Sequence, residues 1–139
     1  MLDLSSYDDA TAALSRAIAS AQNENNLRNC DAATNETIRA GVIHCFEFTY
    51  ELSWKFMRRW LLENHNPDVV SGMSRKELIR LAAENSLIDD VTAWWRFGES
   101  RNKSSHTYHS DVAVDVFKTS VDMLPYALAL QKTLHARND

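Results

Sequence analysis

Apolar residues recur every three to four positions along most of the chain, and this spacing predicts α-helices. The pattern is strongest from about Glu36 to Asn64, where two neighbouring rows of apolar and aromatic side chains follow the helical repeat. The first row is Ile38, Val42, Cys45, Thr49, Leu52, Phe56 and Trp60, and the second is Ile43, Phe46, Tyr50, Trp54, Met57 and Leu61. Two rows make a face too wide for a surface helix. We therefore expect part of this long helix to form a dimer interface.

The residues before the long helix predict one further helix, from about Tyr7 to Gln22. Ser6 is its expected N-cap, because a serine hydroxyl can accept a hydrogen bond from a free backbone N–H of the first turn. Asp9 then occupies the favourable third position. The Asn-rich stretch at residues 23–35 is expected to connect this helix to the long one.

The long helix is expected to end in the loop Asn64–Gly72, which contains Pro67. A third helix follows from Ser74 to about Asn85. Ser74 and Glu77 have the spacing of a capping box, in which each residue satisfies a free N–H at the start of the helix. This start is the most sharply defined helix boundary in the sequence.

A fourth helix is predicted from about Asp89 to Lys103, with acidic residues in its first turn, where the helix dipole favours negative charge. Its inward-facing residues are expected to be Val91, Trp94 and Trp95. A fifth helix begins near Ser110 or Asp111. Pro125 lies inside it and is expected to kink or split it, because proline lacks the N–H that a helix interior needs.

The composition agrees with a helical fold. The chain has 139 residues, of which 45% are apolar and 24% are charged, as in ordinary globular domains. Three Gly and two Pro are too few turn residues for a β-rich fold of this length. We therefore predict a single all-α domain over residues 1–139, a bundle of about four main helices with a kinked or split C-terminal helix.

Charge and cysteine content restrict the functional classes. The net charge of −4 and the pI of about 5.7 argue against broad binding of nucleic acid through a basic surface, although a small local site stays open. The amino terminus has no apolar segment typical of a signal peptide, and no stretch is apolar enough to span a membrane. Two cysteines, Cys30 and Cys45, are too few for a disulfide framework. The expectation is a reduced, cytoplasmic protein without membrane contact.

Arg101 and His106 are the candidate catalytic residues, although their Arg-x4-His spacing alone is weak evidence. A second pair with this spacing, Arg39 and His44, lies inside the long helix. Residues five apart on a regular helix point about 140° apart, so the side chains of that second pair cannot converge. We interpret Arg39 as a solvated arginine and His44 as a histidine that faces the bundle.

The pair at 101 and 106 lies where the fourth helix is expected to end. Serine and threonine are poor residues for a helix interior, and they occupy three of the positions between 104 and 107. A distorted helix end could bring Arg101 and His106 together. Asn102, Lys103 and Tyr108 make the surroundings polar and basic. The sequence therefore predicts a local anion site within an acidic chain.

An arginine and a histidine without a carboxylate cluster suit cleavage of a phosphodiester without metal or cofactor. The histidine can remove the proton of a ribose 2′-hydroxyl, and the guanidinium can stabilise the charge that develops on the phosphoryl oxygens. Because the nucleophile is the 2′-hydroxyl, the substrate would be RNA. Two copies across a dimer axis would supply both a base and an acid.

Two alternative interpretations concern metal and base stacking. His106, His109 and Asp111 could be metal ligands, but three mixed ligands in a Ser/Thr-rich turn make a weak set. Four tryptophans could stack nucleic-acid bases, but their helical spacing favours packing in the core or an interface. They are Trp54, Trp60, Trp94 and Trp95.

Two segments, FEFTYELSWKFM at residues 46–57 and ESRNKSSHTY at residues 99–108, resemble the HEPN superfamily. Within it, the chain is similar to nucleotidyltransferase substrate-binding proteins, also called HepT-like toxins. The resemblance covers nearly the whole chain. It implies an up-and-down bundle of about four main helices that forms a homodimer or a higher even oligomer. It also implies a partner, a minimal nucleotidyltransferase encoded nearby.

The resemblance also implies roles for single residues. Arg101 and His106 would be the catalytic pair of a metal-independent ribonuclease toxin, and Asn102 fits the polar residue expected after the arginine. Tyr108 would be the tyrosine that the partner modifies with AMP to silence the toxin. An alternative within the same branch makes the protein a non-catalytic subunit that binds substrate or nucleotide for the nucleotidyltransferase.

Overall fold

The computed structural model describes residues 1–23 and 31–138, and within these residues it contains helices and no strands. Six α-helices and one short 3-10 helix follow one another, so the predicted all-α class is confirmed. Their bounds are α1 Ser5–Gln22, α3 Ala32–Asn64, α4 Pro67–Ser71, α5 Arg75–Glu84, α6 Val91–Lys103, η1 Ser104–His106 and α7 Ser110–Ala136.

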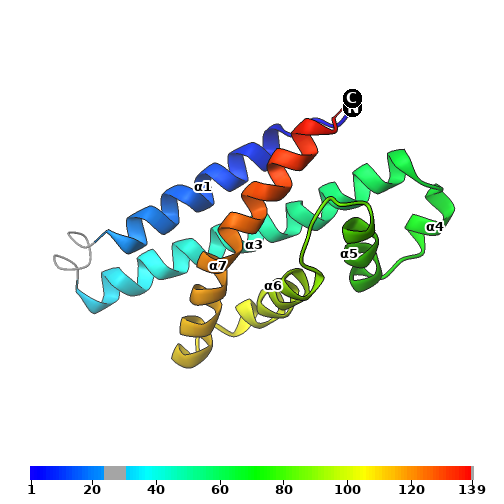
Figure 1. Cartoon of the computed structure of the whole chain (residues 1–139). Helices are drawn as coiled ribbons and strands as arrows, with labels where there is room; N and C mark the ends of the chain where they lie inside the picture. Colours follow the sequence, from blue (N-terminus) through cyan, green and yellow to red (C-terminus); the bar gives the residue numbers. More distant parts are fainter. Residues whose placement is uncertain (24–30, 139) are drawn as a thin grey trace.

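The helix α3 is the centre of the bundle, and every other α-helix in the described part of the chain packs against it. Figure 1 shows α1 lying antiparallel along α3, with α7 crossing both and α5 and α6 gathered at one side. The core between them is rich in aromatic rings, each of which gains on the order of 1.5–3 kcal/mol from burial. Its largest fully buried side chains are Trp94, Tyr7, Tyr50, Phe46, Phe56 and Phe97.

The first two helices begin earlier than expected, because an aspartate accepts hydrogen bonds at the start of each one. Asp3 accepts hydrogen bonds from both the N–H and the hydroxyl of Ser5, so α1 starts at Ser5 and Ser6 is not its N-cap. Asp31 accepts from the N–H of Thr34 and caps α3 one turn before the predicted start. The expected connection at residues 23–35 is therefore shorter, and its residues 24–30, with Cys30, lie outside the described residues.

The middle of the chain follows the prediction more closely. Ser74 accepts a hydrogen bond of 3.2 Å from the N–H of Glu77, which confirms it as the cap of α5. The loop before it contains the short helix α4, which the sequence did not predict, with Pro67 at its first position. Asp90 caps α6 from outside the helix, so the acidic residues expected in its first turn precede it.

The last helix, α7, begins at Ser110 as predicted and continues through Pro125 without a break in its assignment. The ribbon bends along its length in Figure 1, so the helix is bent rather than split. Its end returns to the start of the chain. Asn138 accepts a hydrogen bond from the N–H of Leu2 and donates one to the carbonyl oxygen of Leu2, both at 2.8 Å.

The wide apolar face of α3 is used mostly within the chain. Its most central residues are buried by α1, α6 and α7, whereas Cys45 and Leu52 are only partly covered. These two residues, with the 58% exposed ring of Phe48, line an apolar groove of about 510 Å³ beside α1. The predicted dimer interface stays a prediction. Across the described residues, no helix combines the length and apolarity required to cross a membrane.

Candidate functional site

The helix α6 ends at Lys103, and the chain continues as a single turn of 3-10 helix, Ser104–His106. Two serine hydroxyls promote this change. Ser104 donates to the carbonyl oxygen of Arg101 at 2.6 Å, and Ser105 donates to that of Asn102 at 3.1 Å. Such local bonds satisfy carbonyls that a regular helix would leave free at its end. The predicted break in the helix between Arg101 and His106 is confirmed.

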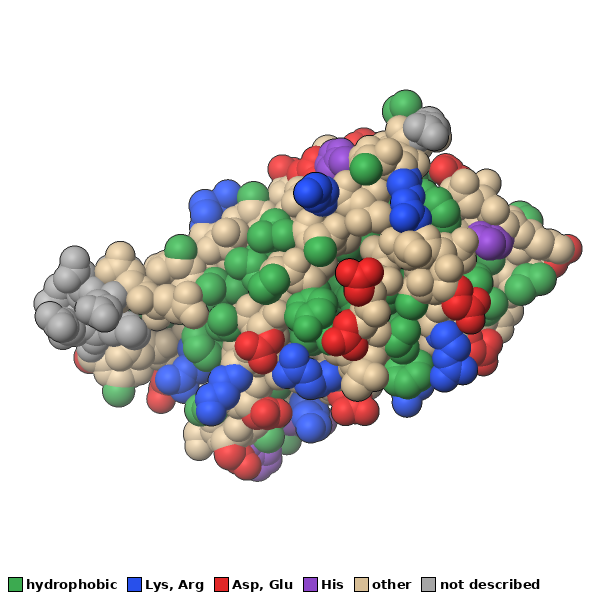
Figure 2. Space-filling view, in the orientation of Figure 1, with side chains coloured by type: hydrophobic (Ala, Val, Ile, Leu, Met, Phe, Trp, Pro, Cys, Tyr) green, Lys and Arg blue, Asp and Glu red, His purple; other side chains and the backbone are tan. Residues whose placement is uncertain are grey.

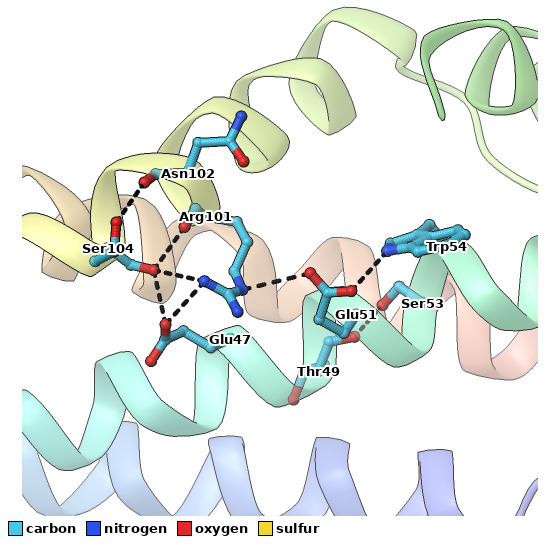
Figure 3. Close-up of polar contacts among 9 residues, drawn as sticks. Glu47, Thr49, Glu51, Ser53, Trp54, Arg101, Asn102 and Ser104 are labelled. Atoms are coloured by element: carbon cyan, nitrogen blue, oxygen red, sulfur yellow. Dashed lines mark hydrogen bonds and ion pairs between the residues drawn. The ribbon is translucent and has the colours of Figure 1, made fainter. Parts of the chain in front are cut away.

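The side chain of Arg101 extends from α6 toward α3, where it lies between Glu47 and Glu51 (Figure 3). Its Nη1 is 3.0 Å from an oxygen of Glu47, and its Nε is 3.4 Å from an oxygen of Glu51. Nη1 also donates to the hydroxyl of Ser104 at 3.1 Å. Glu51 is fixed in turn by the indole N–H of Trp54 at 3.0 Å. The guanidinium is therefore held in one orientation.

The charges of this cluster do not cancel. One guanidinium lies between two carboxylates, and all three side chains are 28–30% exposed. The contact of Nε with Glu51 is an ion pair without hydrogen-bond geometry. Among the described residues, no hydrogen bond is formed by the Nη2 amine of Arg101. The Arg101 side chain is 30% exposed and lines a groove together with Lys55, so an anion from outside can approach it.

His106 and Tyr108 form a second, exposed pair beside the Arg101 cluster. The phenol oxygen of Tyr108 lies 3.4 Å from Nδ1 of His106, and the two rings meet edge to face at 5.9 Å. Tyr108 is 76% exposed, and its ring centre lies 4.4 Å from that of His109. An imidazole beside an accessible phenol can accept its proton. Both groups are accessible to a large substrate.

The predicted site residues thus lie close together in the sequence, at the end of α6, in η1 and just after it, but their side chains have separate partners. Within the part of the chain that the structure describes, no hydrogen bond or ion pair joins Arg101 to His106. Asn102 and Lys103 are exposed beside them. The contact between the guanidinium and the imidazole that the broken helix could allow is therefore absent within one chain. A substrate that spans both groups could still join them.

Sequence reasoning missed Glu47 and Glu51, so its premise that no carboxylates accompany the arginine is wrong, and it treated Ser104 only as a residue of the helix end. Glu47 and Glu51 lie four residues apart, so they share a face of α3, where two like charges repel unless a cation lies between them. This spacing within a mostly apolar helix was a signal that a cation was needed. Ser104 connects the parts, because its hydroxyl also lies 2.8 Å from the Glu47 carboxylate.

A cavity of about 420 Å³ adjoins this cluster between α3, η1 and the start of α7. Arg39, Glu47 and Tyr108 contribute to its lining. Arg39 is partly buried, with its guanidinium carbon 5.7 Å from the ring centre of Phe117, so it is only partly solvated. His44 is exposed against Phe48, so the expectation that it faces the bundle is wrong.

The alternatives raised by the sequence can also be placed. Over the described residues, no three His, Cys, Asp or Glu side chains come together as metal ligands, so the proposed metal set is not assembled. Trp94 is buried, as the packing interpretation predicts, and Trp60 packs against the core. Trp54 and Trp95 are partly buried, as Trp60 is, and they pack against the same core. Figure 2 shows acidic and basic side chains mixed over one face, without a large region of one sign.

Comparison with known proteins adds independent findings. The family described as "Nucleotidyltransferase substrate binding protein like" matches residues 2–136. A Haemophilus influenzae protein named "Probable ribonuclease HepT" is 32% identical over 138 residues, which cover 99% of this chain and 94% of that protein. The sequence match therefore extends over nearly the whole of both chains.

Solved structures agree on the fold. A Haemophilus influenzae structure, described as the fold of a substrate binding domain of a nucleotidyltransferase, superimposes with a TM-score of 0.90 at 30% identity and covers 96% of this chain and 99% of that one. A structure from Thermus thermophilus has a TM-score of 0.62 at 27% identity and covers 91% of this chain and 97% of that one.

Proposed function

Because this chain belongs to the family of nucleotidyltransferase substrate-binding proteins of the HepT-like branch, we propose that it is the HEPN component of a two-gene pair with a minimal nucleotidyltransferase. Its own activity is that of a metal-independent endoribonuclease toxin in the cytoplasm. The observation that carries the proposal is the turn after α6. There an oriented arginine and an exposed histidine lie on either side of a helix break. The similarity to a protein named as a ribonuclease supports it.

The reaction follows from the chemistry of these two groups. His106 takes the proton of a ribose 2′-hydroxyl, whose oxygen attacks the neighbouring phosphorus. The bond to the 5′-oxygen of the next nucleotide breaks, and that oxygen leaves with a proton from a second acid. The products are a 2′,3′-cyclic phosphate and a 5′-hydroxyl. The Nη2 amine of Arg101 stabilises the negative charge on the phosphoryl oxygens.

The carboxylates of Glu47 and Glu51 act as positioning groups in this reaction. They hold Nη1 and Nε of Arg101, so the guanidinium needs no reorganisation when a phosphate reaches Nη2. Their negative charge also lowers affinity for the ground-state phosphodiester. The same charge opposes the transition state, in which the phosphoryl oxygens carry more charge, so the two carboxylates help only by orienting Arg101.

A second copy of the chain supplies the acid. The apolar groove around Phe48 continues toward the site, because His44, Phe48 and Arg101 line one further groove. An exposed phenylalanine beside such a groove is suited to pack against its equivalent in a symmetric dimer. This arrangement would bring two copies of the turn together. Phe48→Glu should therefore produce monomers by sedimentation and lower cleavage, whereas a monomeric wild type would contradict the dimer.

Tyr108 serves as the off-switch. Its phenol oxygen attacks the α-phosphorus of ATP bound by the nucleotidyltransferase, pyrophosphate leaves, and AMP stays on the tyrosine. The proton goes to His106, whose Nδ1 lies 3.4 Å away. The exposure of Tyr108 supports this role, since a buried tyrosine could not reach a second enzyme. Tyr108→Phe should gain no mass from the partner and ATP.

The decisive experiment compares wild-type protein with His106→Ala and Arg101→Ala on single-stranded RNA in the presence of EDTA. Wild type should leave cyclic phosphate ends, and each variant should be at least about 100-fold slower. His109→Ala is the matched control, because His109 is another exposed histidine of the same turn and should change the rate little. Equal cleavage by wild type and His106→Ala would refute the proposal.

The second candidate is a non-catalytic subunit that presents substrate or nucleotide to the nucleotidyltransferase. The family description and the description of the Haemophilus influenzae structure favour it. So does the pairing of Arg101 with two carboxylates. It predicts a stable complex with the partner, no RNA cleavage by either protein, and harmless expression of the intact chain alone. Growth arrest that depends on His106 would exclude it.

A further inference from the structure

A groove of about 400 Å³ lies between α5 and α6, and cations and aromatic rings form its walls. Arg75 and Lys76, in the first turn of α5, line it together with Trp95 and Asn102 of α6. Asn102 is the residue after Arg101, so the groove opens beside the turn that carries the proposed catalytic pair. It is distinct from the cavity next to Tyr108, which has other lining residues.

The cations of this region lie over the faces of two tryptophans. The guanidinium carbon of Arg75 is 4.6 Å from the ring centre of Trp54. Lys76 and Arg80 each have their charged group 5.3 Å from the ring centre of Trp95. These contacts hold the cations at the surface without neutralising them. In a chain with a net charge of −4, four positive charges surround these two partly exposed indoles, and the fourth is Lys55 beside Trp54. One carboxylate, Glu51, accepts from the indole N–H of Trp54, so positive charge still predominates here.

The floor of the groove contains an unpaired polar group. The hydroxyl of Tyr50 is buried without a hydrogen bond of good geometry, although the guanidinium of Arg75 lies close enough to act on its pKa, and the residue is 0% exposed. It points at Gly98, where a Cβ would lie only 2.6 Å from the hydroxyl oxygen. The helix α6 can therefore approach α3 closely here only because residue 98 lacks a side chain. A buried donor without a partner is uncommon and costs free energy.

We propose that this groove binds single-stranded RNA next to the phosphate that is cleaved. Arg75 and Lys76 contact backbone phosphates, and a base stacks on the indole of Trp95 in the place that the ammonium of Lys76 leaves. The proposal rests on the proposed ribonuclease function and adds the surface that orients its substrate. RNA fits better than an acidic protein surface, because a carboxylate would use only the cations, whereas a nucleotide uses the aromatic faces as well. One acidic side chain, Glu99, also lines the groove and opposes RNA binding.

The test measures binding of a fluorescein-labelled oligouridylate of about twelve nucleotides to His106→Ala protein, which cannot cleave it. Replacing Arg75 and Lys76 together by Ser should weaken binding about tenfold, and the slope of log affinity against log salt should fall by about 1.4, or 0.7 per lost contact. Glu99→Gln should strengthen binding. The matched control replaces two lysines of α7, Lys118 and Lys132, by Ser and should change the affinity less than about twofold.

Tryptophan emission is the second readout. Oligouridylate should quench it on binding, and Trp95→Phe should remove part of the quenching and weaken binding. Equal weakening by the groove variant and the α7 control, or binding without quenching, would overturn the proposal. So would unchanged RNA affinity with loss of the complex with the nucleotidyltransferase, because the groove would then bind the protein partner.

The two proposals can fail separately. If wild type does not cleave RNA but binding depends on Arg75 and Lys76, the ribonuclease function falls and the groove stands as an RNA site. If cleavage depends on His106 while the groove variant binds and cleaves RNA as well as the control does, the groove proposal falls alone. Circular dichroism of each variant confirms that the helices are retained.

Discussion

Two clusters of polar side chains include residues of α3 that lie within two turns of each other (Figure 3). The clusters differ in charge and burial. The first, the hydroxyl cluster, consists of Tyr7, Thr49 and Ser53, which are all 0% exposed. The Tyr7 hydroxyl lies 2.8 Å from that of Ser53 and donates to the carbonyl oxygen of Ala127 at 3.1 Å. The second, the arginine cluster, consists of Glu47, Glu51, Arg101 and Ser104, and its charged members are nearly a third exposed.

The difference shows which cluster can exchange partners. A buried hydroxyl that loses its partner finds no water, so breaking the contact carries the full cost of leaving the group unsatisfied. Burial also raises the pKa of the Tyr7 phenol, which therefore stays neutral. Partly exposed ion pairs contribute little to stability, because water and salt replace them readily. The hydroxyl cluster therefore maintains the fold, and the arginine cluster can exchange its partners, as the proposed function requires.

The largest expected effect follows from changing the geometry of the arginine cluster alone. Arg101→Lys keeps the charge but loses the planar fork that contacts Glu47, Glu51 and Ser104 at the same time. Cleavage should fall about 100-fold, whereas the free energy of unfolding should change by less than about 1 kcal/mol. Rates on labelled RNA and urea titrations measure both. Arg96→Lys on the same helix is the control. An equal loss of activity in that variant would show that the loss does not depend on the arginine cluster.

Tyr50 provides a third case for the comparison, because its hydroxyl is buried like the hydroxyl cluster but makes no hydrogen bond of good geometry. Burial raises the pKa of this phenol, and the charge of Arg75 acts in the opposite direction. Gly98→Ala should destabilise the protein by about 1–3 kcal/mol, although alanine is the better helix former, because its Cβ would overlap the hydroxyl.

The rescue of that variant is the sharper measurement. Tyr50→Phe removes the hydroxyl, after which the nearest ring atom would be 3.4 Å from the new Cβ. The double variant should recover about 1 kcal/mol or more relative to Gly98→Ala alone, as a coupling in a double-mutant cycle measured by urea unfolding. Simple additivity of the two single effects would show that the hydroxyl is not the source of the clash.

A smaller effect is expected from Tyr7→Phe in the hydroxyl cluster. The change deletes the contacts with Ser53 and the carbonyl oxygen of Ala127 without changing the packing of the ring. Stability should fall by about 1 kcal/mol, and RNA cleavage should stay within about twofold of wild type. If the cleavage rate of Tyr7→Phe fell by clearly more than this, the hydroxyl cluster and the arginine cluster would be coupled through α3.

The smallest effect is expected for Asp8, whose partly exposed carboxylate stabilises the packing of α1 on α7 and lies outside both clusters. It accepts hydrogen bonds from Gln131 at 2.7 Å and from His135 at 2.8 Å, which join α1 to α7. Burial acts to raise the pKa of Asp8, but these bonds and the nearby charge of His135 outweigh it, so the pKa lies below 3.8. The stabilisation is therefore present above pH 3.8 and is lost as the pH falls through the lowered pKa.

Asp8→Asn should accordingly cost only about 0.5 kcal/mol or less at pH 7, because the carboxylate is 38% exposed. The difference from wild type should shrink as the pH is lowered below 3.8. Thermal unfolding over a pH series measures it. Asp9→Asn removes the same charge from the next residue and is the control, and an equal pH dependence there would assign the effect to net charge rather than to the contact.

Much of the fold was predictable because its signals are local. The repeat of apolar residues indicated the helices, and the spacing of Ser74 and Glu77 predicted the start of α5 correctly. The start of α3 was predicted one turn late, because Asp31 lies in a stretch whose polar composition resembles a loop. Whether Pro125 bends or splits α7 could not be decided locally, since packing along the whole helix outweighs one lost hydrogen bond.

The candidate site was predictable only in part, for the opposite reason. The serines after Arg101 act within three residues, so the helix break could be inferred from the sequence. The contact between Ser104 and Glu47 joins positions 57 residues apart, and no local pattern specifies it. The role of Glu47 and Glu51 therefore became visible only when the packing of α6 on α3 was known. The groove at Trp95 likewise depends on how α5 meets α6.

The paired hydrogen bonds between Leu2 and Asn138 have a consequence for engineering. Because the two ends of the described chain lie together, a linker of a few residues could join them, and the polypeptide could be opened elsewhere (Figure 1). The turn at Gly72, between α4 and α5, is exposed and is a suitable place for new ends. Such a circular permutant would begin with α5 and α6 and end with α3 and α4. The order of synthesis could then be changed without altering the bundle.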